Sequence, residues 1–534
     1  MFMNRFFSFC AIATILAGCG GGGNAVNHMY RSSNNWGAEY GNDVAGTPSS
    51  MQYGNFSATD GNMHRVAVLL PLSGQNASAG KTIRTSVEMA VLQSAPQNLS
   101  VTFFDTARSD AFENAASEKP DVIIGPVFAG DARMLNAIKS VDTPALSFTS
   151  DATAVGDGIM TMNLMPTNSV EAITKEMSSD NVTKFVILAP DTESGRLMAG
   201  TAKNAASIYG IKLVGIIYYT PGNSESIKTA AIRTSMNVAR TAANTRAREI
   251  LSDILTKERL TAIEKSSLSM QLDKISKSDT LGTVPYDAVL FLGAGDDTMA
   301  LASFLRYYNV SARDARFYGT TMWDGSNITS DFTMSGAKYA ALPEINENFA
   351  NLYSQISGTA PSHLAAFGYD AANMAIGMIY SDKSDAAYLL DPSGYIGVSG
   401  LVRLRPNGDS QRALRILELD ASGTPRIVRA APQNFITPIY NIEQRHIIPA
   451  SEMELETDGI NPMNYIRIPE RLNRKYKSKT FGANMTHTAA VIPPVENITV
   501  LPEDDSDPIE NPDFQPSSLE SVNRTYIDSV EIEE

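Results

Sequence analysis

The feature that most constrains the fold of this chain is a long alternation of strand-like and helix-like segments between His64 and Ala431. Short apolar runs such as RVAVLLPL, DVIIGPV and KFVILAP are each followed by a loop and then by apolar residues at helical spacing. Strands that are apolar throughout are buried on both faces, which is typical of parallel sheets made of βαβ units. Because about 370 residues are too many for one such sheet, the pattern predicts an α/β protein with two lobes.

One segment departs from this alternation. Residues 225–280 contain no strand candidate and are rich in Ala, Arg, Lys, Glu and Leu. Ile250, Leu251 and Ile254 gather on one helical face. We therefore expect two or three amphipathic helices inserted into the second lobe. Two interpretations remain open: the helices cover an edge of the sheet, or they form a docking surface for a partner protein.

The N-terminal region has the features of an export signal followed by a linker. Arg5 precedes an apolar segment at residues 6–17, which suits a signal-peptide core and is shorter than the roughly 20 residues of a membrane-spanning helix. We interpret residues 1–18 as a signal peptide. Residues 19–63 are rich in Gly, Asn, Ser and Thr without periodicity, and this composition predicts a flexible tether.

The C-terminal region, residues 432–534, loses the regular pattern and is expected to be largely disordered. Residues 471–480, RLNRKYKSKT, hold five basic residues and no acid. The last 34 residues hold eleven acidic residues against the single Arg524. Most of the chain's net charge of −15 therefore lies in this tail, which argues against nucleic-acid binding. The two charged blocks are interpreted either as solvated disorder or as interaction segments.

The sequence gives no support for catalysis. Its five histidines are far apart, and it contains no HExxH, CxxC or G-x-S-x-G motif. Its two cysteines, Cys10 and Cys19, both lie near the N-terminus. We therefore predict no catalytic residues, no metal site and no cofactor, and we expect the protein not to be an enzyme.

The sequence LAGC, residues 16–19, resembles the lipobox of bacterial lipoproteins, in which the cysteine is diacylated and becomes the mature N-terminus. The resemblance implies a lipid anchor on Cys19 after removal of the signal peptide. Gly20, the residue after the cysteine, is similar to the pattern for sorting to the outer membrane. The expected location is therefore the periplasmic side of the outer membrane in a Gram-negative bacterium.

The stretch VAVLLPLSGQNASAGKTIRTSVEMAV resembles the opening of type I periplasmic binding proteins, the leucine/isoleucine/valine-binding fold. FFDTARSD, DVIIGPVFAGDA and PALSFTSDAT match its next three strand–loop steps in order. Later segments, including APDTESGRLMAG, FYGTTMWDG and HLAAFGYDAANMA, resemble the penicillin-binding-protein-activator lipoproteins. The resemblance implies two lobes, each a mostly parallel sheet flanked by helices. Lobe one takes residues 64–165 and 343–397, and lobe two takes residues 166–342 and 398–431.

Proteins of that fold bind ligands at the carboxyl ends of the strands, in a cleft between the lobes. Ser147 and Thr149 stand where the relatives use hydroxyls to hold a ligand carboxylate. Phe128 lies in a loop where the relatives typically offer serine, so the resemblance implies an altered cleft. The candidate cleft residues are Ser73, Phe128, Ser147, Thr149, Glu193, Trp323 and Asp324.

Two functions follow from the resemblance. The first is a lipid-anchored regulator that binds a penicillin-binding protein and stimulates peptidoglycan synthesis. The second is a periplasmic receptor that binds an amino acid or a small amide for transport or sensing. The altered loop, the tether and the helical insertion favour the regulator. Hydroxyls at Ser147 and Thr149 favour the receptor.

Overall fold

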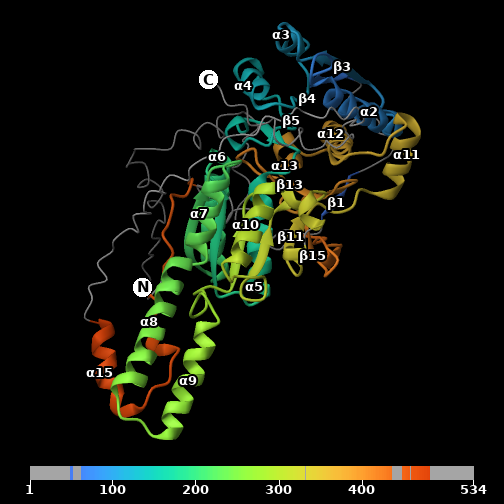
Figure 1. Ribbon diagram of the computed structural model, residues 1–534. Coiled ribbons are helices and arrows are strands. Elements are labelled where there is room, and N and C mark those ends of the chain that lie inside the picture. Colours follow the sequence, from blue (N-terminus) through green and yellow to red (C-terminus); the bar gives the residue numbers. More distant parts are fainter. Residues whose placement is uncertain (1–47, 52–61, 331, 436–447, 457–458, 482–534) are drawn as a thin grey trace, which may run out of the picture. The chain divides into compact units, whose positions relative to one another are not determined.

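The computed structural model describes residues 48–51, 62–330, 332–435, 448–456 and 459–481 (Figure 1). These residues divide into two compact units. Unit 1 contains the described residues up to 164, together with 345–411 and 434–435. Unit 2 contains 165–344, 412–433 and the described residues from 448 onward. The predicted signal peptide, Cys19 and the acidic end of the tail lie outside the described residues.

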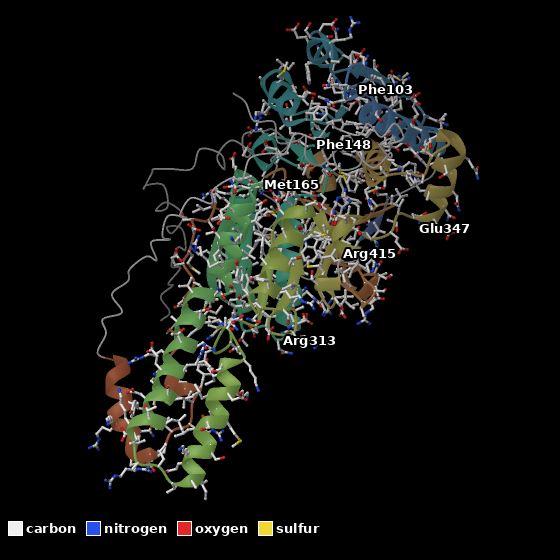
Figure 2. The ribbon with its side chains drawn as sticks, in the orientation of Figure 1. Phe103, Phe148, Met165, Arg313, Glu347 and Arg415 are labelled. Atoms are coloured by element: carbon white, nitrogen blue, oxygen red, sulfur yellow. The ribbon has the colours of Figure 1, made fainter. Side chains whose placement is uncertain are left out.

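Unit 1 is built on a five-stranded sheet of order β3-β2-β4-β5-β6, in which every strand pair is parallel. Strand β2 is buried from Val66 to Leu70, as expected for a strand covered on both faces. Phe148, labelled in Figure 2, follows β5 and is also buried. The strands are β2 (His64–Leu70), β3 (Leu99–Asp105), β4 (Val122–Ile124), β5 (Ala145–Ser147) and β6 (Ile159–Thr161), and the helices are α2 (Ala77–Ser94), α3 (Ala111–Ser117), α4 (Ala129–Ile138), α11 (Glu347–Ser357), α12 (His363–Ile379) and α13 (Asp385–Leu389), with the 3-10 turn η1 (Ala152–Ala154).

A second sheet in unit 1 corrects the predicted extent of the tether. Its strand order is β1-β12-β13-β14, with β1 at Ser49–Ser50, β12 at Tyr395–Gly397, β13 at Gly400–Leu404 and β14 at Ser410–Arg412. Strand β1 pairs in parallel with β12, and the next residue, Met51, is buried. Residues 48–51 are therefore part of the folded unit, and the prediction of a tether through residue 63 was wrong for them.

The turn from β12 to β13 also corrects a predicted boundary. Residues 398–411, which are predicted to belong to lobe two, lie in unit 1. The reason is the buried carboxylate of Asp370 on α12, which accepts hydrogen bonds from the backbone N–H groups of Val398 (2.8 Å) and Ser399 (3.0 Å). Strands β12 and β13 then pair antiparallel on either side of this turn. The chain passes into unit 2 only after Gln411.

Unit 2 is built on a seven-stranded sheet of order β16-β15-β11-β10-β9-β7-β8. The pairs from β11 to β8 are parallel, whereas β15 and β16 join antiparallel at one edge. Arg415 on β15, labelled in Figure 2, pairs with Glu344 at 2.8 Å. The strands are β7 (Lys184–Pro190), β8 (Lys212–Tyr219), β9 (Ala288–Phe291), β10 (Arg316–Gly319), β11 (Lys338–Ala341), β15 (Arg415–Leu419) and β16 (Pro425–Arg429), and the flanking elements are α5 (Pro166–Ser179), α6 (Glu193–Tyr209), α10 (Gly295–Tyr307), η2 (Thr321–Trp323), η3 (Asn327–Ser330) and η4 (Phe332–Met334).

The inserted segment of unit 2 forms three helices, α7 (Ser224–Thr234), α8 (Asn237–Lys257) and α9 (Ala262–Ser276). Helix α9 begins at a capping box, because Thr261 and Glu264 each bond the other's backbone N–H. Helices α8 and α9 extend from the sheet as a hairpin, and the basic C-terminal block folds beside them as η5 (Pro462–Asn464) and α15 (Glu470–Phe481) (Figure 1). We call residues 237–276 and 459–481 the helical finger.

The helical finger has an apolar core of its own. Leu472 and Tyr476, one turn apart on α15, are buried against Ile250 and Leu251 of α8 and Leu268 of α9. The expectation of a disordered region from residue 432 onward is therefore wrong for residues 459–481. Spacing of four between two apolar residues within the charged sequence RLNRKYKSKT is the signal that could have revealed this helix.

Residues 448–456, here called the strap, also depart from the predicted disorder. Met453 and Ile216 exchange backbone hydrogen bonds of 2.9 and 3.0 Å, so the strap pairs with β8, the outer strand of the sheet. Close packing on α6 requires Gly200, because a Cβ there would lie 2.0 Å from the carbonyl oxygen of Ile448. The strap, and not the inserted helices, covers this part of the sheet edge.

Within the described residues, no helix combines the length and the apolar character that are needed to cross a bilayer.

Candidate functional site

The carboxyl edge of the unit 1 sheet is organised by Asp105, the last residue of β3. Its Oδ1 accepts the backbone N–H groups of Leu72 (2.8 Å), Ser73 (3.2 Å) and Ala107 (3.2 Å). Burial raises the pKa of this carboxyl, but the hydrogen bonds from Ser73, Leu72 and Ala107 outweigh it and leave the pKa lowered. Asp105 is thus held ionised as a brace for the loop after β2. Ser73, a predicted cleft residue, is exposed on that loop.

The two predicted ligand hydroxyls of unit 1 are buried. Ser147 is 0% exposed and Thr149 is 3% exposed. The Ser147 hydroxyl donates to the carbonyl of Pro126 (2.9 Å) and accepts the N–H of Thr149 (3.2 Å). Thr149 Oγ1 accepts the N–H of Asp151 at 3.2 Å. Because a hydroxyl has one hydrogen, Ser147 has none left for a ligand carboxylate in this conformation.

Phe128 and its neighbours form the start of α4. Phe128 is half-buried and lies at the N-cap position, where its side chain accepts no hydrogen bond. One turn into the helix, burial raises the pKa of the Asp131 carboxyl, partly offset by a hydrogen bond from Thr106. The loop after β4 therefore places an aromatic side chain, which has no hydrogen-bond donor, at the N-terminus of α4.

Of the three predicted cleft residues in unit 2, Trp323 is a core residue. It is 0% exposed, its Nε1 donates to the carbonyl of Gly293 (3.0 Å), and its ring lies 6.0 Å from that of Phe291. The prediction that Trp323 lines a cleft was wrong. Its indole ring packs directly against Gly319, where a Cβ would lie 2.2 Å from Trp323 Cε2. Glu193, in the first turn of α6, and Asp324 are exposed and stay predictions.

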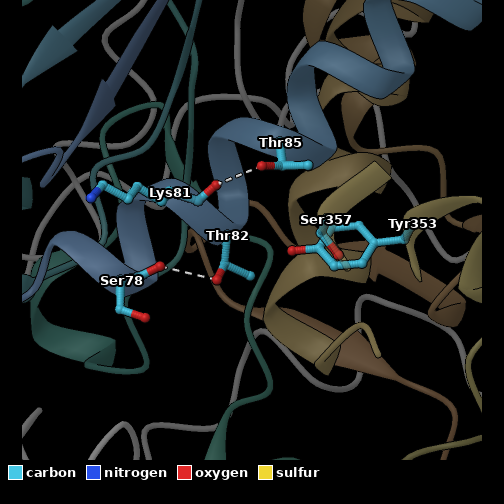
Figure 3. A pocket seen from close by; sticks show the side chains of 6 residues that line it. All are labelled: Ser78, Lys81, Thr82, Thr85, Tyr353 and Ser357. Carbon is cyan, nitrogen blue, oxygen red and sulfur yellow. Dashed lines mark hydrogen bonds between the residues drawn. The ribbon is translucent and has the colours of Figure 1, made fainter. Parts of the chain in front are cut away.

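A shallow polar depression lies within unit 1, between α2 and α11, with a volume of about 350 Å³ (Figure 3). Sequence analysis did not identify it. Two of its hydroxyls are committed to their own helix, since Thr82 donates to the carbonyl of Ser78 (3.0 Å) and Thr85 to that of Lys81 (3.1 Å). Its lining residues are Ser78, Lys81, Thr82, Thr85, Tyr353 and Ser357.

The helical finger presents an outward face with two large apolar side chains. Ile263 and Met270 lie seven residues apart on α9, so they share a helical face, and they are 83% and 64% exposed. The opposite face of α9 packs Leu268 and Ile275 into the finger core. The outward face of α9 is therefore an accessible apolar surface, and large exposed apolar side chains gathered on one face are typical of protein contacts.

Ion pairs fasten α15 to the rest of the finger. Arg471 pairs with Glu264 of α9, and Lys475 with Glu258 at the end of α8. The hydrogen bond from Arg471 is the largest cause that lowers the pKa of Glu264, to about 2. The strap is attached in the same way, because Arg233 pairs with both Glu452 (2.7 Å) and Glu454 (2.8 Å). The C-terminal segments are thus bound by charge as well as by apolar contacts.

Within the described ranges, no group of three or more His, Cys, Asp and Glu side chains is placed to hold a metal ion.

Comparison with known proteins gives a family and a fold. The family model described as LppC putative lipoprotein matches residues 25–378. Two curated relatives named penicillin-binding protein activator LpoA are similar over shorter stretches. The protein from Mannheimia succiniciproducens is 26% identical over 32% of this chain and 31% of its own length. The protein from Pasteurella multocida is 29% identical over 28% of this chain and 27% of its own length. The match therefore spans less than a third of either relative.

Among solved structures, a putative branched-chain amino acid ABC transporter protein from Rhodospirillum rubrum superimposes with a TM-score of 0.50 at 15% identity. The superposition covers 68% of this chain and all of that one. This likeness confirms the predicted fold class, an α/β protein of the type I periplasmic binding protein fold with parallel sheets flanked by helices.

Proposed function

Because the chain belongs to the LppC family of putative lipoproteins, we propose that it is a lipid-anchored, non-enzymatic regulator that binds and activates a penicillin-binding protein. The observation that carries this proposal is the similarity to two curated relatives that are themselves named penicillin-binding protein activators. The family model matches residues 25–378 and so overlaps most of the stretch, about residues 64–430, whose sequence resembles these proteins. The partner is thus expected to be a cell-wall synthase of the penicillin-binding protein class.

The anchor in this proposal is diacylated Cys19 after removal of residues 1–18, and the location is the periplasmic face of the outer membrane in a Gram-negative bacterium. Its support is the lipobox-like LAGC sequence and the family description. Two or more acyl chains hold a protein at a bilayer far more firmly than one. The Cys19→Ser variant is expected to appear in the soluble fraction of lysed cells, whereas the wild type sediments with membranes. Continued sedimentation of the variant would contradict the anchor.

The burial of two predicted ligand-binding residues, Ser147 in unit 1 and Trp323 in unit 2, supports a regulator over an amino-acid receptor. The Ser147 hydroxyl is enclosed and donates to Pro126. Turning the hydroxyl toward a ligand would give up this enclosed hydrogen bond, at a cost of about 0.5–1.5 kcal/mol, while the Pro126 carbonyl keeps the N–H of Phe148 at 2.8 Å. Trp323 is likewise occupied by core contacts. Two of the seven residues proposed for ligand binding are therefore already engaged elsewhere.

We propose the outward face of α9 in the helical finger as the contact with the synthase. The supporting observation is the pair Ile263 and Met270, exposed on one face of a helix whose other face is packed. Fully desolvated apolar anchors of this kind supply much of the affinity of protein interfaces.

The test is affinity capture from detergent-solubilised envelopes with tagged full-length protein. The wild type should enrich a penicillin-binding protein, and the Ile263→Ser/Met270→Ser variant should lose most of that enrichment. The matched control is Leu92→Ser on α2 of unit 1, a side chain that is 78% exposed and equally apolar. Equal capture by both variants would exclude the α9 face, and no synthase captured by the wild type would contradict the regulator.

A thermal-shift panel of amino acids and small amides separates the receptor from the regulator. A ligand at 100 times its Kd stabilises the state that binds it by about 2.7 kcal/mol. The regulator proposal predicts no shift for any compound in the panel. A clear shift with one of them would restore the receptor.

A further inference from the structure

The helical finger carries a positive charge opposite to that of the chain. Residues 237–281 and 459–481, which span the finger and its return to the sheet, contain fourteen Lys and Arg residues against seven Asp and Glu residues. The whole chain has a net charge of −15. Folding brings together two segments that are far apart in sequence, α8–α9 and α15, and it thereby concentrates basic residues on one small module.

Not all of these cations are used inside the finger. Arg240 is buried and donates to backbone carbonyls, and Arg471 and Lys475 pair with glutamates. Six others are exposed, and no carboxylate among the described residues lies within ion-pair distance of them: Arg248, Arg259, Lys265, Lys274, Arg467 and Arg474. They come from α8, α9, the turn between them and the C-terminal segment.

We propose that these exposed cations bind the acidic C-terminal tail of the same chain, residues 503–534. The tail supplies eleven carboxylates against one arginine, which is the charge complement of the finger. A basic surface of this size attracts an anionic segment over distances of about the Debye length, roughly 10 Å at 0.1 M salt. This contact depends on charge and chain connectivity alone, whichever synthase the protein binds.

Chain length permits this contact. Twenty-one residues separate Phe481, the end of α15, from Glu503, the first acid of the tail. Their maximum span is on the order of 70 Å, whereas α8, with 21 residues, is about 31 Å long. Every cation of the finger is therefore within reach. Attachment to the same chain also gives the tail an effective concentration in the millimolar range, so many weak ion pairs suffice to hold it.

A bound tail makes the finger's cations accessible to a partner only when the tail is released. A bound tail would compete with any acidic segment of a partner for the same cations. Raising the salt concentration, or a partner with a better complement, would release it. The finger is accordingly a binding site for an acidic peptide segment, and residues 503–534 of the same chain are such a segment.

The test is zero-length cross-linking of the purified full-length protein with a carbodiimide, which joins a carboxylate to a lysine only when the two are in contact. Mass spectrometry should find amides between tail carboxylates and Lys265 or Lys274 at 0.1 M salt. These products should fall about tenfold at 1 M salt, where the Debye length is about 3 Å. Lys81, exposed on α2 of unit 1, is the reference lysine and should give few such products.

Two variants distinguish a specific surface from general attraction. Arg248→Glu/Arg474→Glu removes cations from the finger and leaves the reporting lysines in place, and it should lower the cross-links about fivefold or more. Arg65→Glu/Arg108→Glu, with two exposed arginines of unit 1, should leave them unchanged. Circular dichroism of each variant confirms that it is folded.

Tail cross-links spread equally over Lys81 and the finger lysines would overturn the proposal, as would their absence from a folded protein. Binding of the finger to vesicles containing phosphatidylglycerol, undiminished in the presence of the tail, would also overturn it in favour of a membrane surface. Because the experiment uses the protein alone, its outcome is independent of whether a synthase is captured from envelopes.

Discussion

Replacing Leu472 by Ala tests whether the C-terminal helix is held to the finger by its apolar side chains. Leu472 is 7% exposed and lies in the cluster that joins α15 to α8 and α9. The substitution removes three carbon groups, each worth about 0.8 kcal/mol when buried, or about 2.4 kcal/mol in all. The finger is a surface module that can close around the missing atoms, so the cavity adds little to this loss.

The loss is local, because the apolar core of the finger is a cluster separate from the main apolar cluster of unit 2. A decrease of about 2.4 kcal/mol in the free energy of opening multiplies the population of detached α15 by roughly 60. Backbone amides of α15 should therefore exchange hydrogen for deuterium about 60 times faster. Amides of β2 in unit 1 should keep the wild-type rate.

Arg474→Ala, an exposed substitution two residues further along α15, is the matched control and should change exchange by less than about threefold. Equal exchange of α15 in the two variants would refute the apolar attachment. A parallel increase in β2 would show that the finger is not a separate cooperative element.

Three further predictions concern other contacts. Arg471 lowers the pKa of Glu264 from 4.5 to about 2, so the Glu264 carboxylate stabilises the docked α15 fully above pH 4.5 and loses this effect as the pH falls toward 2. The Nε–H resonance of Arg471 should therefore report a transition below pH 4.5, and Glu264→Gln should abolish it. A transition that survives this substitution would contradict the ion pair. Asp370→Ala leaves the N–H groups of Val398 and Ser399 buried without an acceptor and should lower the free energy of unfolding, measured by chemical denaturation, by about 3 kcal/mol. Asp370→Asn, which keeps one oxygen, should lower it less. Equal losses in the two variants would show that the carboxylate does not fix the turn. Trp323→Ala truncates a core side chain and should destabilise unit 2 by about 3–5 kcal/mol, whereas Met322→Ala at the exposed neighbouring residue should cost less than about 0.5 kcal/mol. A similarly small loss for Trp323→Ala would contradict its buried position.

The alternation of apolar runs and helical stretches was enough to predict the fold class. β2 and β7 are buried nearly throughout, and their sequences are accordingly continuous apolar runs. Such runs, separated by helical stretches, indicate parallel strands that are covered on both faces. The inserted helices were equally readable, because the apolar residues of α8 recur at helical spacing. These features are local, since each depends on residues within one element.

The boundary near β13 and the burial of Trp323 depend on residues that are distant in the sequence. Nothing in the sequence around Gly400 indicates that a carboxylate on α12, some 30 residues earlier, fixes the turn before it. Trp323 stands beside exposed residues in a glycine-rich loop, and only the packing of Phe291 and Tyr339 around it makes it a core residue. The predicted cleft residues follow strand-like runs in the sequence, but the burial of each side chain is set by neighbours from other elements.

By itself the sequence determined two α/β halves, the helical insertion and the separation of charge along the chain, because periodicity and composition belong to contiguous residues. Only the tertiary structure decided that the basic block at 471–480 folds against α8 and α9, since Leu472 and Tyr476 gain a helical conformation from a surface about 200 residues away. The same contact places cations from two distant segments of unit 2 on one module. Charge along a chain is a sequence property, but a charged surface exists only once distant segments are packed together.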